Sequence, residues 1–320
     1  MLNPAPLDTT AIQGIEIAGL TSEDLDSAET RRRLVDLWVQ HGLIVFRDLY
    51  GPELQLKLSE VFGPCIEHPG KQIDQARTFP QLIAIDFHPE RSDIYEVEGQ
   101  KLGGWLPWHM DTIYVAQVNH GGILTELGET TSGGVTGFMD KVTLYDALPD
   151  ELKARIAGRE VIYRYDLDMA RQRFGKRPGQ RVVRWSERRA EMQSRIDKGH
   201  YPPVVHPLTF VQPGTGRTLL NLSPWFAERI VGMSFAESDR LLGEIIDNHM
   251  DEAKAYYHSW SPGDMVLWDN WRMIHNASGV PIDVTRRARR STIAGDYELG
   301  RLATAEDLAC EDAGGRVCPA

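Results

Sequence analysis

The stretch Trp105-Leu-Pro-Trp108-His109-Met110-Asp111 is the part of the chain from which the fold can be worked out. Leu-Pro before the histidine and Thr-Ile-Tyr-Val after the aspartate favour an extended segment. Residues i and i+2 of a strand point to the same face, so His109 and Asp111 are expected to stand side by side. We therefore expect the rest of the chain to form a frame that presents this pair.

An imidazole and a carboxylate placed in this way are two of the three ligands of a 2-His-1-carboxylate facial triad. Such triads hold Fe(II) in non-haem oxygenases and leave further metal positions open for other ligands. The third ligand has to come from elsewhere in the chain. We predict that it is His275, which lies on a short strand near the C-terminal end.

The same tripeptide occurs a second time, as His249-Met250-Asp251. This copy ends a segment that begins with the capping-box pattern Ser234-Phe-Ala-Glu237 and continues with apolar residues at helical spacing. On a helix, residues i and i+2 do not face each other. We therefore expect that the second copy cannot bind a metal. His109 and Asp111 are candidate metal ligands because they lie in an extended segment.

Composition places the chain among soluble globular proteins. Charged residues make up 25% of its 320 residues, and the net charge of -11 argues against nucleic-acid and membrane-surface partners. Cys65, Cys310 and Cys318 show no C-x-x-C spacing, which fits a reducing compartment better than a disulfide framework or a zinc ribbon. The N-terminus lacks a signal-peptide pattern. We expect a cytoplasmic homo-oligomer, either a dimer or a tetramer, that acts on a small molecule.

Short apolar runs separated by glycine turns outnumber the long periodic segments. This pattern favours a mostly β protein with flanking α-helices, built as a barrel or a double-sheet jelly roll. No internal repeat or linker is visible, so we predict one domain over residues 1–320. The expected strands cover 43–46, 81–85, 122–126, 134–138, 161–163, 256–260, 265–268, 273–277 and 290–294, with a hairpin in 204–222 and helices at 27–41, 52–62, 142–157 (interrupted at Pro149) and 234–251.

A basic, lid-like insertion is expected at about 165–202. Its part from Arg171 to Lys198 holds ten lysines and arginines against Glu187, Glu191 and Asp197. This block is either a mobile lid over an acidic substrate or a nucleic-acid patch, or else a solvated insertion or a subunit contact. The acidic remainder of the chain counts against nucleic acid.

An ordered set of motifs makes the chain resemble the taurine/2-oxoglutarate dioxygenase family, which also includes aryloxyalkanoate dioxygenases. The resemblance extends from the strand at 43–46 to about Gly295. It implies a double-stranded β-helix (a cupin-like jelly roll) that holds Fe(II), with 2-oxoglutarate and O2 as co-substrates. The motifs are Trp108-His109-x-Asp111, Gly133-Gly-x-Thr136, Gly263-Asp264 to Trp268-Asp-Asn270, His275 and Arg286.

The resemblance also implies roles for individual residues. Arg286 matches the arginine that binds the far carboxylate of 2-oxoglutarate, a planar group that suits a guanidinium. Thr136 matches a threonine that adds a hydroxyl donor to the same molecule. On the substrate side, Arg290 matches the arginine at the anionic head of taurine, and His68 matches a histidine beside it. Trp105 stands close to where the taurine enzyme has an asparagine, so we count it among the substrate-binding candidates.

Departures from the taurine pattern change the expected substrate. Trp105 replaces the asparagine, Lys71 stands where a tyrosine is expected, and Trp271 stands where an arginine follows Trp-Asp-Asn, with Arg272 one place later. The extra indoles indicate a bulkier, more apolar or aromatic substrate than taurine. We therefore predict a dioxygenase that hydroxylates or oxidatively cleaves a small to medium, anionic organic acid and releases succinate and CO2.

Two alternatives stay open at this point. A zinc-dependent hydrolase could use the same three ligands with a bound water, but it would need no 2-oxoglutarate and gives the spacing from His275 to Arg286 no purpose. A non-catalytic jelly-roll binding protein could keep the site without turnover. Halogenation is disfavoured, because a halide would need the position that Asp111 fills.

Overall fold

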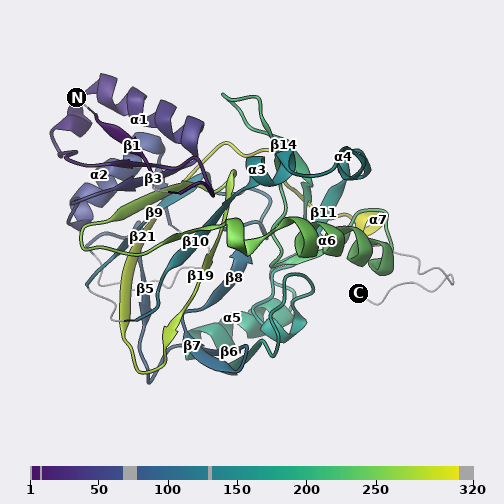
Figure 1. Ribbon diagram of the computed structural model, residues 1–320. Coiled ribbons are helices and arrows are strands. Elements are labelled where there is room, and N and C mark those ends of the chain that lie inside the picture. Colours follow the sequence, from purple (N-terminus) through teal and green to yellow (C-terminus); the bar gives the residue numbers. More distant parts are fainter. Residues whose placement is uncertain (1, 8, 68–77, 129–131, 310–320) are drawn as a thin grey trace.

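Two sheets form the centre of the protein, and their strands are antiparallel except for the parallel pair β2 and β3 (Figure 1). The computed structural model describes residues 2–7, 9–67, 78–128 and 132–309. The larger sheet has the order β1-β2-β3-β18-β9-β21-β4, and β5 also pairs with β21. Its strands are β1 (Pro4–Pro6), β2 (Ile15–Ile17), β3 (Leu43–Phe46), β18 (Met265–Asp269), β9 (Gly121–Glu126), β21 (Arg286–Ile293), β4 (Cys65–Ile66) and β5 (Leu82–Phe87). The smaller sheet has the order β17-β10-β19-β8, with β17 (Tyr256–His258), β10 (Thr136–Asp140), β19 (Met273–Ala277) and β8 (Leu106–His109).

Apolar side chains from both sheets meet in one cluster. Val266 and Trp268 of β18 belong to it together with Phe138 of β10 and Met273 of β19, and each is at most 2% exposed. Two sheets that pack face to face through such side chains are the arrangement of a jelly roll. The predicted fold class, a mostly β core with helices outside, agrees with this arrangement.

The first two helices cover the outer face of the larger sheet. α1 (Ala28–His41) begins at the Ser27 cap and ends at Gly42, whose φ of 73° is the left-handed conformation that favours glycine. α2 (Pro52–Phe62) follows. Trp38 of α1 lies in a cluster with Phe46 of β3. Both helices were predicted within one residue of their bounds, because each carries a clear start signal and ends at a glycine.

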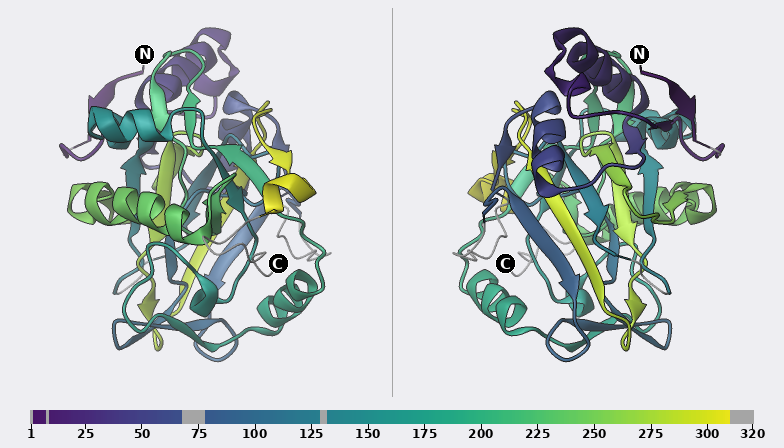
Figure 2. Two further views of the ribbon diagram at one scale, coloured as in Figure 1. Left: turned by 90° about the vertical axis from the view of Figure 1, so that its right-hand side faces the viewer. Right: turned by 90° about the vertical axis from the view of Figure 1, so that its left-hand side faces the viewer.

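A third sheet (β16-β11-β13-β22), the hairpin β14-β15 and four more helices lie on the other side of the molecule, as the two views of Figure 2 show. α6 (Phe235–His249) has the predicted capping box between Ser234 and Glu237. The predicted hairpin is formed by β14 and β15. The elements are α3 (Lys141–Asp146), α4 (Asp150–Ile156), β11 (Glu160–Tyr163), β13 (Val204–Pro207), β14 (Thr209–Val211), β15 (Thr218–Leu220), β16 (Ala227–Ile230), β22 (Arg301–Leu302) and α7 (Ala305–Leu308), with 3-10 turns at Asp24–Asp26, Met169–Arg171 and Glu252–Lys254.

The basic insertion, which we call the lid segment (residues 165–202), contains β12 (Arg181–Arg184) and α5 (Glu187–Asp197). β12 extends a small sheet with β6 (Ile94–Val97), β7 (Gln100–Gly103) and β20 (Val280–Pro281), and this sheet with α5 lies at the bottom of Figure 1, away from α1 and α2. Neither β6 nor β7 was predicted, because their sequence is polar and mixed.

Several lid-segment arginines are paired with carboxylates. Arg171 meets Asp197 at 2.9 Å, Arg173 meets Asp239 at 2.7 Å, and Arg181 meets Glu96 at 2.7 Å. Such pairs at the surface contribute little stability but neutralise the charge. The segment is therefore not an open basic patch, which supports the interpretation as a solvated insertion for these residues. No helix in the described ranges combines the length and the apolarity that crossing a membrane requires.

Candidate active site

Two histidines face each other across the strand pair β8 and β19. The register places His109 directly opposite His275, and the centroids of their rings are 4.3 Å apart. Nδ1 of His109 lies 2.7 Å from the carbonyl oxygen of Pro107, which accepts a hydrogen bond from Nδ1–H and leaves Nε2 with a lone pair. Burial lowers the pKa of His109 and, with a further contribution from the charge of His109, lowers that of His275 to about 3. Both rings are therefore neutral at pH 7, which is the form that binds metals.

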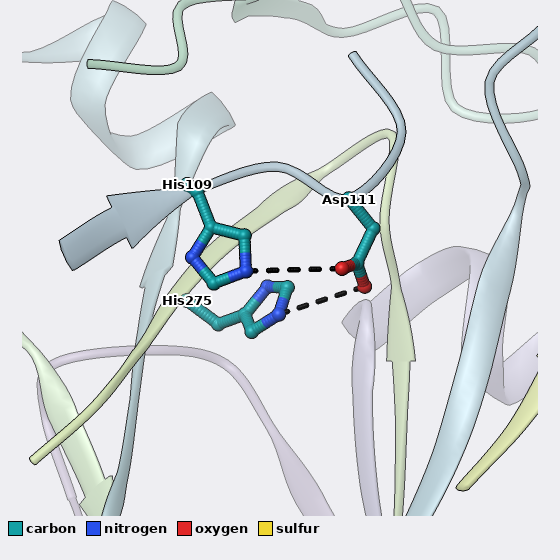
Figure 3. A group of neighbouring side chains, drawn as sticks. All are labelled: His109, Asp111 and His275. Atoms are coloured by element: carbon teal, nitrogen blue, oxygen red, sulfur yellow. Dashed lines mark ion pairs between the residues drawn. The ribbon is translucent and has the colours of Figure 1, made fainter. Parts of the chain in front are cut away.

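The carboxylate of Asp111 completes the group (Figure 3). Its Oδ1 lies 3.7 Å from Nε2 of His109, and its Oδ2 lies 3.5 Å from Nε2 of His275. One donor atom from each of the three residues can be chosen so that all lie within 4.8 Å of one another. Two imidazoles and one carboxylate at this separation can bind a divalent metal on one face. The structure thus brings together the three residues predicted as metal ligands.

The prediction that His109 and Asp111 lie side by side as alternate residues of one strand was wrong. Asp111 is not part of a strand: β8 ends at His109, and residues 111–114 form a turn. Thr112 has a φ of 55°, a left-handed conformation that is uncommon for threonine. The carboxylate therefore reaches the histidines because the backbone turns, and not because strand residues alternate.

Asn270 holds this turn in place. Its side-chain oxygen accepts a hydrogen bond from the N–H of Asp111 at 2.9 Å, and its amide donates to the carbonyl of Asp111 at 3.0 Å. The same amide donates to the carbonyl of Asn119, and Thr112 donates through its hydroxyl to the side chain of Asn119 at 2.7 Å. These bonds replace those that a neighbouring strand would make. Asn270 belongs to the Trp-Asp-Asn motif, but no role for it was predicted from the sequence.

Arg290 lies against the same carboxylate. Its Nη2 is 2.8 Å from Oδ2 of Asp111, and its guanidinium carbon is 5.1 Å from the ring of Trp268. Trp268 in turn lies 5.1 Å from the ring of His275. Arg290 is therefore at the metal-binding group, as expected of a residue near the reacting atoms, and it is already engaged in an ion pair.

Arg286 and Thr136 supply buried polar atoms that have no hydrogen-bond partner among the described residues. Arg286 and Arg290 share one face of β21, because they are four residues apart, or about 13 Å along the strand. Nε and Nη2 of Arg286 lack a hydrogen bond, and Nε is 3.8 Å from Glu126, too far for one. The hydroxyl of Thr136 is also buried without a partner. Buried donors of this kind are rare without a ligand, and they fit an anionic one.

Strand β21 corrects a second prediction. It was expected to begin at Arg290, but it begins at Arg286. The basic run 286–290, in which four of five residues are arginines, was left outside the predicted strand apart from Arg290 itself. Pairing with β5 and β9 on either side extends the strand through this run. Arg286 is thereby held in the sheet, which fixes its direction.

The substrate-side predictions are placed only in part. Trp105 is 7% exposed, and its ring lies 6.2 Å from that of Tyr95. His68 and Lys71 lie outside the described residues. The structure therefore leaves the prediction for His68 untested, whereas Trp105 lies three residues before the Trp108-His109 pair in a buried position.

An aromatic cluster that the sequence analysis missed begins at His109. The edge of Trp225 faces the ring of His109 at 5.5 Å, and Phe226 stacks on Trp225 at 4.1 Å. Phe226 then contacts Tyr114 and Tyr165, whose rings stack at 3.9 Å. No local pattern in the sequence indicates that residues 225 and 226 approach position 109.

Comparison with known proteins places this geometry in context. Residues 5–292 match the family described as taurine catabolism dioxygenase TauD, TfdA family. Over 303 residues the chain is 31% identical to the (S)-phenoxypropionate/alpha-ketoglutarate-dioxygenase of Sphingobium herbicidovorans. The aligned region covers 91% of this chain and 94% of that protein. It is 28% identical over 302 residues to the alpha-ketoglutarate-dependent 2,4-dichlorophenoxyacetate dioxygenase of Cupriavidus pinatubonensis, covering 91% and 97% respectively.

The fold has solved counterparts. The structure of AAD-2 in complex with Mn(II) and N-oxalylglycine matches with a TM-score of 0.68 at 22% identity, covering 92% of this chain and 98% of that one. This similarity confirms the predicted jelly-roll fold. The family match and the relative at 31% identity confirm the resemblance and the enzyme class that the motifs predicted. The chain belongs to the TauD, TfdA family of 2-oxoglutarate-dependent dioxygenases.

Proposed function

We propose that the protein hydroxylates, or oxidatively cleaves, a small to medium organic acid with an aromatic or apolar body, and releases succinate and CO2. Fe(II), 2-oxoglutarate and O2 are the predicted cofactor and co-substrates, and they are those of the family to which the chain belongs. The observation that carries the proposal is the convergence of His109, Asp111 and His275 within 4.8 Å. Around them lie buried donors that lack a partner among the described residues.

In this proposal the three residues hold the metal. The carbonyl of Pro107 orients His109, and Asn270 fixes the backbone of Asp111. When bound, Fe(II) supplies the activation of O2 that couples decarboxylation of 2-oxoglutarate to oxidation of the substrate. The protein contributes positioning and the exclusion of water, since the three ligands are at most 8% exposed.

Arg286 and Thr136 bind 2-oxoglutarate in this proposal. The guanidinium of Arg286 can donate two parallel hydrogen bonds to the far carboxylate of the co-substrate, which would satisfy Nε and Nη2. Thr136 can donate its hydroxyl to the same molecule. A zinc hydrolase on the same triad would leave both of these buried donors without a use, so the co-substrate explains more of the site.

Trp105, Arg290 and His68 are the residues that we propose for the substrate, His68 on the resemblance alone. The aromatic rings next to His109 support a substrate with an aromatic body, because ring-on-ring contacts stabilise such a molecule beside the metal ligands. The relative from Sphingobium herbicidovorans is named for phenoxypropionate. An aryloxyalkanoate is therefore the substrate class that we propose.

Cytoplasmic location, homo-oligomeric assembly as a dimer or tetramer, and a single domain over residues 1–320 stay predictions. Sedimentation equilibrium of the purified protein tests the assembly, because a monomer would contradict it. Limited proteolysis tests the single domain, since a stable fragment shorter than residues 5–292 would contradict it.

Succinate formation tests the activity. The protein is incubated with Fe(II), ascorbate, 2-oxoglutarate and one of a panel of acids that includes 2-phenoxypropionate and taurine. We expect succinate that depends on Fe(II), disappears with a chelator and is stimulated more by 2-phenoxypropionate than by taurine. No succinate with any acid would contradict the proposed activity, and stimulation by taurine alone would contradict the proposed substrate class.

A further inference from the structure

Arg189 differs from the paired arginines of the lid segment. Its Nε lies 3.1 Å from Oδ2 of Asp93, but its Nη1 is buried and has no hydrogen-bond partner among the described residues. Its side chain is 22% exposed, against 55% for Arg171 and 59% for Arg181. The part of Arg189 that recognises planar anions is therefore turned into the protein rather than toward solvent.

Asp93 is itself held by hydrogen bonds, and it therefore fixes the direction of the Arg189 side chain. Oδ1 of Asp93 accepts hydrogen bonds from the N–H and the hydroxyl of Ser186, at 2.7 and 2.9 Å. Ser186 is the N-cap of α5, so the carboxylate fastens the start of this helix to the strand β6 that follows Asp93. The ion pair with Nε thus leaves Nη1 of Arg189 with the capacity to bind a second carboxylate.

The guanidinium of Arg189 lies among the tyrosines that adjoin the metal-binding residues. Its carbon is 6.0 Å from the ring of Tyr95, which packs near Trp105. Burial raises the pKa of Tyr165, and the charge of Arg189 counteracts part of this rise.

A continuous series of rings joins the two places. It runs from His109 to Trp225 at 5.5 Å, to Phe226 at 4.1 Å and then to Tyr165 at 5.5 Å. A molecule with an aromatic ring and a carboxylate matches the two features of these residues, buried aromatic rings and a cation. By contrast, Arg290 is already paired with Asp111 at 2.8 Å.

We propose that Arg189 binds the acidic group of the substrate, while the body of the substrate contacts Tyr95, Tyr114, Tyr165 and Trp105. This inference rests on the proposed function and adds to it a second cation besides Arg290. Arg189 then makes the site select acids over neutral molecules of the same shape. It also gives the lid segment a role in substrate recognition through one residue, whereas its surface arginines serve the fold.

Calorimetric titration tests this role without turnover. The protein is loaded with Mn(II) and 2-oxoglutarate and titrated with 2-phenoxypropionate, with its neutral amide and with phenyl sulfate, which distinguishes a carboxylate from a sulfate ester. We expect the wild-type protein to prefer at least one of the two anions to the amide. Arg189→Gln should weaken binding of that anion about 10- to 100-fold, because a hydrogen bond to a charged group is lost. Binding of the amide should change by less than about twofold.

Two further variants separate recognition from folding. Arg195→Gln removes one charge from an exposed position on the same helix and should keep the preference for the anion. Asp93→Asn removes the ion pair but keeps the guanidinium, and it should also keep the preference. Arg189→Lys should restore part of it, since an ammonium is a cation without the fork.

Several outcomes would overturn the inference. These are an unchanged affinity for the anion in Arg189→Gln, an equal loss for anion and amide, and a wild-type protein with no preference for either anion. Succinate formation is measured on the same samples. A wild-type protein that prefers the anion through Arg189 but forms no succinate would contradict the proposed function and leave this inference standing. A protein that forms succinate but shows no change in Arg189→Gln would do the opposite.

Discussion

The chain contains the tripeptide His-Met-Asp twice, and the two copies adopt different structures. In the first, His109 ends strand β8, and Asp111 turns back so that its carboxylate meets both His109 and His275. In the second, His249 ends helix α6, and Asp251 caps the 3-10 turn at Glu252–Lys254 by accepting a hydrogen bond from the N–H of Ala253. The same three residues thus form a metal-binding group in one place and a helix terminus in the other.

The difference lies in what surrounds each copy. The first has a third donor, His275, held directly opposite by the register of β8 and β19. It also has Asn270, which takes the two main-chain hydrogen bonds of Asp111. Among the described residues the three-residue group around the first copy is the candidate metal site, and His249 and Asp251 are not part of it. Whether a His-Met-Asp tripeptide can bind a metal therefore depends on the neighbouring residues as much as on the tripeptide itself.

Replacing the two aspartates by alanine tests this comparison most directly. Asp111→Ala should reduce iron-dependent succinate formation to background, because one of three protein ligands is lost. Asp251→Ala should keep the wild-type rate and cost about 1 kcal/mol of stability, the usual effect of losing a cap. Rates are measured by succinate release and folding by circular dichroism. Undiminished activity in a folded Asp111→Ala protein would refute the ligand assignment.

Arg286→Lys tests whether the first copy has a co-substrate site beside it. A lysine offers a point charge in place of a fork, so the 2-oxoglutarate concentration for half-maximal rate should rise about 10- to 100-fold. Arg287→Lys is the matched control, since this exposed neighbour points to the other face of β21. The measurement is the initial rate at varied 2-oxoglutarate. An unchanged requirement in Arg286→Lys would move the role to Arg287 or Arg289.

The sequence predicted the ligand residues better than the way they meet. His109, Asp111 and His275 could be chosen because the residue types and their order match a known metal chemistry. The turn at Thr112 could not be predicted, because Thr-Ile-Tyr-Val has the composition of a strand. Hydrogen bonds with the side chains of Asn119 and of the distant Asn270 hold it as a turn. Contacts between segments far apart in the chain leave no local pattern.

The lid segment is a second region in which contacts between distant segments could not be predicted from the sequence. Its charge was evident in the sequence, but a run of arginines does not reveal which of them meet carboxylates on β6 or α6 and which turns inward. Arg189 is distinguished from Arg188 only by the placement of α5 on Asp93. Helices with strong start signals, such as α6, were predicted correctly because their cap and their apolar spacing are both local.

Asn270→Ala tests how much the surroundings of the first copy contribute. It leaves the N–H and the carbonyl of Asp111 without their partner, and residues that orient a ligand are worth about 10- to 100-fold in metal affinity. We expect a loss near the lower end, since the three ligands themselves remain. Asn248→Ala, beside His249, is the control and should bind Mn(II) as the wild type does. Equal Mn(II) affinities in calorimetry would show that the turn holds without Asn270.

His206 provides the smallest expected effect and acts on the segment that follows Asp111. Its ring is fully buried, with Nε2 3.1 Å from the carbonyl of Val115 and Nδ1 3.0 Å from the hydroxyl of Tyr297. Burial lowers the pKa of His206 from 6.5 to about 4. Below pH 6.5 the unfolded chain therefore binds a proton that the folded protein does not, and the free energy of unfolding falls as the pH falls.

At pH 5.5 this difference amounts to about 1 kcal/mol for one histidine. In His206→Gln the contribution is lost, so the decline in stability from pH 7 to 5.5 should be shallower by that amount. His249→Gln removes a histidine from the end of α6 without touching the Asp111 turn and should keep the wild-type decline. Urea unfolding of the metal-free protein at several pH values measures both. A His206→Gln protein with the full decline would place the acid sensitivity elsewhere, with His109 and His275 as the next candidates because burial lowers their pKa values as well.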